Sequence, residues 1–283
     1  MSSGTKVFRK EDGTAVTAFD GVDLSVGHGE FLCVLGPSGC GKTTMLRCLA
    51  GLETLTHGSI AISGDPVRSG AHKDIGMVFQ RAVLLPWLTV SANVALPLRI
   101  GGYGGRSSKD QIAERVRSLL DLVGLSGFEN AYPYELSGGM QQRASIARAL
   151  ARDPAILMMD EPFGALDALT RQKMNFELVN IWQRSGKTVV LITHSIQEAL
   201  ILADRVVVMS ERPGRLVEEL EIDLPRPRMA AAVGRGSQTY LGLVRQIEQA
   251  LGVSNREVRA GGARSSRDAL IRQERNRRNE QFE

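Results

Sequence analysis

The sequence lacks a long apolar segment. The longest apolar runs, such as VVLITH and VVVM, are far shorter than the roughly 20 residues that a helix needs to span a bilayer. The start, MSSGTKVFRKEDG, is polar, with no apolar core and no small-residue cleavage site, so it does not resemble a secretory signal. We therefore expect no membrane-spanning helix and a cytosolic chain.

Cysteine is also scarce, which limits disulfide and metal chemistry. The three cysteines, Cys33, Cys40 and Cys48, are odd in number, lack metal-ligand spacing and have no neighbouring histidine. We expect reduced thiols, with Cys33 and Cys48 packing as small apolar side chains. Internal repeats are absent as well, which argues against a tandem duplication.

The composition is that of a globular protein with a packed core. Of the 283 residues, 43% are hydrophobic and 23% are charged, which are ordinary values for a folded chain. The net charge of +4 arises largely from an arginine-rich tail at 253–283. We predict that this tail is solvated and partly disordered, and contact with nucleic acid or lipid is the alternative.

Short apolar runs alternate with helical patterns along the chain. We predict strands at 30–36, 155–160, 188–194 and 205–210 and helices at 43–52, 168–184 and 195–203. Strands that are apolar on both faces indicate an α/β fold with a covered, largely parallel sheet. The stretch 81–135 is predicted to be a mostly helical insert, and a last helix is expected near 237–251.

One loop carries a specific phosphate-binding pattern. Residues 36–43, GPSGCGKT, fit G-x-x-x-x-G-K-[ST] between a predicted strand and a predicted helix, the context that this motif requires. Gly36, Gly39 and Gly41 allow main-chain N–H groups to turn towards phosphates. Lys42 is expected to reach the β- and γ-phosphates, and Thr43 to offer its hydroxyl to Mg²⁺.

Polar residues follow three of the predicted strands. Asp160 is the expected magnesium partner, and Glu161 is the candidate general base; a surface Asp-Glu pair is the alternative. Gln80 and His194 also close apolar runs, and ligands bind at the carboxyl ends of strands in open α/β sheets. A surface glutamine and a packed core histidine are the alternatives for these two.

A second anion-binding pattern occurs at LSGGMQQR, residues 136–143. Apolar residues at helical spacing follow it, which places Ser137 and Gly139 at a helix N-terminus, where free N–H groups attract anions. A plain helix cap is the alternative. The helical insert separates this stretch from the phosphate loop, so it need not serve the same nucleotide.

Together these motifs resemble the ATP-binding cassette family over about residues 5–225. The resemblance implies a P-loop NTPase cassette with a mixed, largely parallel core sheet, an N-terminal antiparallel β region and a helical insert. It implies a cassette domain at 1–252 with a helical subdomain at about 81–150, and ATP and Mg²⁺ as ligands. The implied metal ligands are Thr43, Gln80 and Asp160.

The same resemblance implies a composite site. Cassettes of the family pair head to tail, so each ATP lies between the phosphate loop of one subunit and the signature motif of the other. The signature motif of this chain is LSGGM at 136–140. It assigns catalytic roles to Glu161, His194, Gln80 and Lys42. The implied nucleotide-binding residues are Gly36, Pro37, Ser38, Gly39, Cys40, Gly41, Lys42, Thr43, Thr44, Phe8, Ser137, Gly138, Gly139 and Asp167. Phe8 would stack on adenine, or else be an ordinary residue of a short strand.

Longer stretches such as DEPFGALDALTRQ and RPGRLVEELEIDLPRPR resemble the bacterial importers of nitrate, sulfonate and taurine. The resemblance implies an ATP-hydrolysing homodimer on the cytoplasmic face of the inner membrane. Its partners would be two membrane permease subunits and, through them, an extracytoplasmic solute-binding protein. Trp87 would lie near the groove for the membrane subunit, or else be a buried residue of the insert.

Two residues differ from those most common in the family. Met140 replaces the frequent glutamine of the signature motif, and Ser195 replaces the aspartate that often follows the histidine. Ser195 removes a carboxylate that many members have at the subunit interface. One alternative function is a soluble cassette ATPase acting on nucleic acid or ribosomes, although no nucleic acid is expected here. A phosphate-loop kinase or GTPase is another.

Overall fold

The core of the protein is a six-stranded sheet, seen in a computed structural model that describes residues 1–67, 69–70, 72–100, 108–164, 166–226, 228 and 238–252. The strand order is β11-β10-β3-β9-β8-β7, and all neighbours are parallel except β10 and β11. This mixed, largely parallel sheet confirms the predicted α/β class. Its strands are β3 (Phe31–Leu35), β7 (Ile75–Val78), β8 (Ile156–Asp160), β9 (Thr188–Thr193), β10 (Arg205–Met209) and β11 (Leu216–Glu221).

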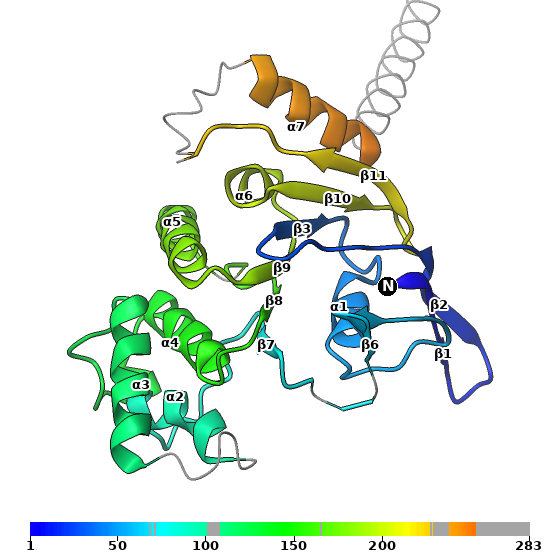
Figure 1. Cartoon of the computed structure of the whole chain (residues 1–283). Coiled ribbons are helices and arrows are strands. Elements are labelled where there is room, and N and C mark those ends of the chain that lie inside the picture. Colours follow the sequence, from blue (N-terminus) through cyan, green and yellow to red (C-terminus); the bar gives the residue numbers. More distant parts are fainter. Residues whose placement is uncertain are drawn as a thin grey trace, which may run out of the picture.

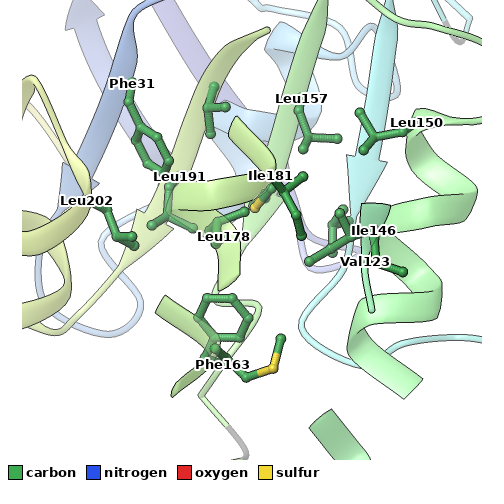
Figure 2. Packing of buried hydrophobic residues seen from close by; sticks show 14 of the residues in the cluster. Phe31, Val123, Ile146, Leu150, Leu157, Phe163, Leu178, Ile181, Leu191 and Leu202 are labelled. Atoms are coloured by element: carbon green, nitrogen blue, oxygen red, sulfur yellow. The ribbon is translucent and has the colours of Figure 1, made fainter. Parts of the chain in front are cut away.

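Both faces of this sheet are covered, as the apolar strands predicted. In β3, Phe31, Cys33 and Leu35 pack into one apolar cluster, while Leu32 and Val34 pack into another on the opposite face. Alternate residues of a strand point to opposite faces, so every position of β3 is buried. Figure 2 shows side chains of the first cluster packed together between the sheet and its helices. Among these helices are α4 (Gly138–Leu150), α5 (Ala168–Ser185) and α6 (Ile196–Leu202).

The N-terminal part forms a separate antiparallel β region, as expected from the resemblance. It consists of a three-stranded sheet of order β2-β1-β4 and a small hairpin, β5-β6, and it lies beside helix α1 (Figure 1). Buried residues of β2 and α1 join the second apolar cluster, so this region closes the sheet's other face. The elements are β1 (Ser2–Arg9), β2 (Ala15–Val22), α1 (Lys42–Leu49), β4 (His57–Ser59), β5 (Ala61–Ile62) and β6 (Asp65–Pro66).

The segment between β7 and β8 is helical and projects from one end of the sheet (Figure 1). It contains α2 (Val90–Arg99), α3 (Lys109–Leu122), the 3₁₀ turn η1 (Pro133–Glu135) and α4 (Gly138–Leu150). Thr89 and Ser108 accept main-chain N–H groups at the starts of α2 and α3, the usual way to begin a helix. Trp87 is 70% exposed, so the alternative of a buried tryptophan is wrong.

After the predicted core, the chain adds one strand and one helix. Strand β11 pairs antiparallel with β10, and α7 (Gln238–Ala250) lies next to β11 (Figure 1). The buried Arg228 guanidinium donates to the carbonyls of Ile222, Ala203 and Leu200. Burial lowers the pKa of Arg228 to about 10. These bonds tie the segment after β11 to the end of α6.

Three further expectations concern the cysteines, membrane spans and the C-terminal tail. All three cysteines are free and buried. Within the part of the chain that the structure describes, none of the helices has the length and apolar character of a membrane span. The predicted arginine-rich tail, 253–283, lies outside the described residues.

Candidate functional site

The phosphate loop joins β3 to α1 in a conformation that depends on Gly41. This residue has φ = 106°, and a Cβ there would lie 2.5 Å from the carbonyl oxygen of Ala18. Both the left-handed backbone and the close approach exclude side chains. The loop therefore packs directly against the β2 backbone, and α1 begins at Lys42 with its N-terminus facing the loop.

Lys42 provides a buried positive charge at the loop. Its side-chain ammonium donates to the carbonyls of Gly36 and Pro37 at 2.7 and 2.8 Å, and Lys42 is 5% exposed. Its hydrogen bonds to oxygen therefore go to main-chain dipoles, with no carboxylate among the acceptors. A buried ammonium whose charge is not neutralised by a contacting carboxylate favours an anionic ligand.

Asp160 lies beside the phosphate loop, at the carboxyl end of β8. Its Oδ1 accepts a hydrogen bond from the Thr43 hydroxyl at 2.9 Å. Burial raises the pKa of Asp160, and the Thr43 hydrogen bond opposes this. Two of the three residues predicted to bind magnesium, Thr43 and Asp160, are therefore in contact.

The carboxylate of Glu161 contacts His194. The φ of 43° at Glu161 lies in the left-handed region, which is unusual for a residue other than glycine and redirects the chain directly after β8. The Nδ1 atom of His194 is 3.2 Å from Oε2 of Glu161. Neighbouring strands thus bring the candidate base and the candidate histidine together.

Gln80 follows β7, and the loop around it is attached to α4. Gln142 donates to the carbonyl of Phe79 at 3.2 Å, and Arg148 donates to the carbonyls of Ala82 and Val83 at 3.1 and 2.8 Å. These three bonds bracket Gln80. The position of Gln80 therefore follows that of α4, the helix that begins with the LSGG stretch.

These elements surround a cleft of about 350 Å³. Among the described residues around it, only Arg212 was not predicted to be a site residue. It lies in the hairpin between β10 and β11, in a stretch that the sequence related to the importers but not to nucleotide binding. Since β10 pairs in parallel with β3, the loop after β10 reaches the same sheet edge as the phosphate loop. The lining residues are Ser38, Gly39, Gly41, Lys42, Thr43, Thr44, Gln80, Asp160, Glu161 and Arg212.

The LSGG stretch lies elsewhere. Ser137 caps α4 by accepting the Met140 N–H at 3.3 Å, and Gly139 faces Thr170 and Met174 of α5. None of Ser137, Gly138 and Gly139 lines the cleft. In this chain, then, the two predicted anion sites are separate.

Asp167 and Phe8 also lie outside the cleft lining. Asp167 caps α5 by accepting the Thr170 N–H at 3.0 Å, and hydrogen bonding from Thr170 lowers the pKa of Asp167. Phe8 is 40% exposed on β1, with the Lys6 ammonium 4.9 Å from its ring centre. The ring thus keeps one accessible surface.

The oxygen donors in the cleft suit magnesium. Within the described ranges, no three His, Cys, Asp or Glu side chains converge in a metal-binding cluster. Mg²⁺ is usually held by one or two protein oxygens together with substrate phosphates and water. The contact of Thr43 with Asp160 beside a phosphate loop fits that arrangement.

Comparison with known proteins decides the family. Residues 19–164, just over half of the chain, match the family described as ABC transporter.

The chain belongs to the ABC transporter family.

Two relatives of this ABC cassette are similar over most of its length. An uncharacterized ABC transporter ATP-binding protein of Methanocaldococcus jannaschii is 51% identical over 79% of this chain and 82% of its own. The taurine import ATP-binding protein of Burkholderia pseudomallei is 46% identical over 82% of this chain and 90% of its own.

A solved cassette has the same architecture. It is a dimeric, post-hydrolysis ATP-binding cassette bound to ADP and phosphate, with a TM-score of 0.69, 35% identity, and coverage of 79% of this chain and 98% of its own. The predicted ABC cassette fold and ATPase activity are thereby confirmed.

Proposed function

We propose that the chain is the ATP-hydrolysing subunit of an importer for a small anionic solute of the nitrate, sulfonate or taurine type. One observation carries the hydrolytic part: a single cleft is lined by a buried lysine, a hydroxyl-carboxylate pair and a glutamate that contacts His194. The taurine import relative supports the solute class. Taurine is an aminosulfonate: its sulfonate group carries one negative charge and its ammonium group one positive charge, so the sulfonate is the anionic group that it shares with the other sulfonates of this class.

The loop binds the nucleotide in this proposal. The N–H groups of Ser38, Gly39 and Gly41 face the phosphates, together with Lys42 and the helix N-terminus at Thr44. Gly36, Pro37 and Cys40 shape the loop, and the two carbonyls that hold Lys42 come from Gly36 and Pro37. The exposed Phe8 ring offers a stacking surface for adenine.

Thr43, Asp160 and Gln80 would hold Mg²⁺, which would supply positive charge to offset the charge that develops on the transferred phosphoryl group. Burial of Asp160 keeps its carboxylate out of water, so its charge acts strongly on a cation in the cleft.

Glu161 orients the attacking water and accepts its proton. Asp160 contacts Thr43 whereas Glu161 contacts His194, so one carboxylate serves the metal and the other serves the water. His194 contacts Glu161 and lies where it can donate to the phosphoryl oxygens. Lys42 stabilises the negative charge on the same group.

The site is completed by a second copy of the chain. Ser137 and Gly138 are exposed at the N-terminus of a 13-residue helix, Gly139 is buried next to them against α5, and all three lie outside their own cleft. The exposed end of this helix is therefore free to meet the phosphates bound by a partner. Asp167, at the start of α5, lies on the same side and approaches the partner as well. The dimeric cassette relative supports the pairing of two cassettes.

The other partners are two membrane permease subunits on the cytoplasmic face of the inner membrane and, through them, an extracytoplasmic binding protein. Trp87 is an exposed aromatic side chain suited to a permease contact. Residues 1–252 form the cassette, with a helical subdomain at about 81–150. Residues 253–283 form a separate tail.

Mixing two inactive variants tests the composite site. Lys42→Ala loses the phosphate loop's charge, and Ser137→Arg blocks the signature. Each is expected to hydrolyse less than about 1% as fast as the wild type. A mixed dimer has one site with both halves intact, so an equimolar mixture should regain roughly a quarter of wild-type activity if subunits exchange freely. Phosphate release measured across mixing ratios gives the result.

Two outcomes contradict the proposal. If the Ser137→Arg chain alone keeps full activity, the signature serves no nucleotide. If the mixture stays inactive while both variants form mixed dimers by size-exclusion chromatography, each site is built within one chain. The wild type mixed with Lys42→Ala is the control for subunit exchange.

A further inference from the structure

Helix α6 carries a buried carboxylate that the proposed mechanism does not use. Glu198 is 6% exposed, and burial raises its pKa, against the hydrogen bond from Thr193 and the charges of Arg171 and His194. The charge of Glu161 acts in the same direction as burial. Burying a carboxylate costs free energy unless hydrogen bonds and nearby charges offset the loss of hydration. The contacts of Glu198 therefore need an explanation.

Glu198 holds both neighbours of His194. Its Oε2 accepts from the Thr193 hydroxyl at 2.5 Å, and its main-chain N–H donates to the Ser195 hydroxyl at 3.2 Å. The Thr193 oxygen in turn accepts the Ser195 N–H at 3.0 Å. These bonds form a closed ring around His194, which fixes the backbone that aims its imidazole at Glu161.

Arg171 connects this ring to the turn before α5. Its Nη2 donates to the Leu166 carbonyl at 2.8 Å, and its Nε lies 3.7 Å from Oε1 of Glu198. Leu166 directly precedes Asp167, the residue that caps α5. One guanidinium therefore contacts the turn at 166–167 with one end and Glu198 with the other.

The distance between Arg171 and Glu198 can shorten enough for a hydrogen bond to form. At 3.7 Å it is an ion pair but not a hydrogen bond, and the Nε atom is buried and without a hydrogen-bond partner in the described part of the chain. A shift of roughly 0.5 to 1 Å would bring it within hydrogen-bond distance. A small displacement of the turn is thus enough to change the bonding of Glu198.

We propose that Arg171 and Glu198 are positioning residues that make the placement of His194 depend on the turn at 166–167. This rests on the proposed function, in which Asp167 approaches the partner subunit. When the partner presses on the turn, Arg171 moves with the Leu166 carbonyl and pulls Glu198. The ring of Thr193 and Ser195 then re-aims His194. Closure of the dimer thereby changes the position of His194.

Kinetics of the full chain with Mg²⁺ and ATP tests this. Glu198→Gln keeps an acceptor for Thr193 but loses the charge facing Arg171, and Arg171→Met removes the guanidinium. Each should lower kcat roughly 10- to 100-fold, because small misplacements of catalytic groups have effects of that size. The KM for ATP and the affinity for a fluorescent ADP should change less than about twofold, and Arg171→Lys should recover part of kcat.

A double-mutant cycle with His194 separates positioning from a general structural role. If both residues act through His194, a double variant that combines His194→Ala with Glu198→Gln or Arg171→Met should have nearly the same kcat as His194→Ala alone. Glu177→Gln and Arg184→Met, elsewhere on α5, are matched controls and should hydrolyse ATP like the wild type. Melting temperatures check that each variant is folded.

The inference is overturned if Glu198→Gln and Arg171→Met match their controls in kcat, or if their losses multiply with that of His194→Ala. If Glu198→Gln does not fold, the Arg171 variants decide alone. Failure of the function itself would look different, because the wild type would then fail to hydrolyse ATP or the mixing experiment would fail.

Discussion

Replacing Gly214 by alanine should displace the phosphate loop, because the added methyl group would clash with the loop at Cys40. Gly214 lies in the hairpin between β10 and β11, and a Cβ there would be 2.2 Å from the carbonyl oxygen of Cys40. Carbon-oxygen contacts need about 3.3 Å, so something must move by about 1 Å. The φ of Gly214 is outside the positive region, so the clash is the main effect of the substitution.

The hairpin cannot easily supply this movement. The N–H of Gly214 donates to Ala18 at 3.1 Å, and its carbonyl accepts from Asp20 at 3.0 Å, which ties it to β2. We therefore expect the loop at Cys40 to shift. Overpacking of this kind costs about 1–3 kcal/mol of stability, and a shift of about 1 Å should weaken ATP binding roughly 10- to 100-fold.

Urea unfolding and titration with a fluorescent ATP analogue measure the two effects. Gly242→Ala is the control, because nothing lies within 4 Å of the added methyl group and the residue is inside α7. It should raise stability by about 0.5–1 kcal/mol and leave nucleotide affinity unchanged. The reasoning is refuted if Gly214→Ala unfolds and binds nucleotide like the wild type.

The remaining predictions concern charges at the cleft. Arg212→Ala should raise the KM for ATP several-fold, and more at low salt, because the cleft loses a cation; Arg215→Ala, whose guanidinium is 2.6 Å from Asp20 outside the cleft, should leave the KM unchanged in the same steady-state assay. Glu161→Gln should bind ATP, dimerise on size-exclusion chromatography and lose about 10²- to 10⁴-fold in hydrolysis. Full activity of this variant would exclude Glu161 as the base.

The sequence predicted the parts of the cleft that come from local motifs. The phosphate loop, Asp160 and Glu161 each follow an apolar strand, and the carboxyl ends of parallel strands meet at one edge of a sheet. Gln80 and His194 were found by the same argument. This is why most of the cleft lining could be predicted before the strand order was known.

Arg212 and β11 were missed for different physical reasons. Arg212 reaches the cleft only because β10 pairs with β3, a contact between distant parts of the chain with no local pattern. Strand β11, LVEELE, is an edge strand with only Leu220 buried, so it lacks the apolar run that marks central strands. Its charged exposed positions are typical of a protected sheet edge.

The structure also bears on Ser195, where many family members have an aspartate. The hydroxyl of Ser195 accepts the Glu198 N–H at 3.2 Å, so serine keeps the helix cap that an aspartate would provide. An aspartate would add a third carboxylate beside Glu161 and Glu198, and the burial of Glu198 makes such repulsion costly. Serine therefore retains the ring around His194 without adding charge to it. In the proposed dimer, the turn at Asp167 then remains a route by which the partner can affect His194.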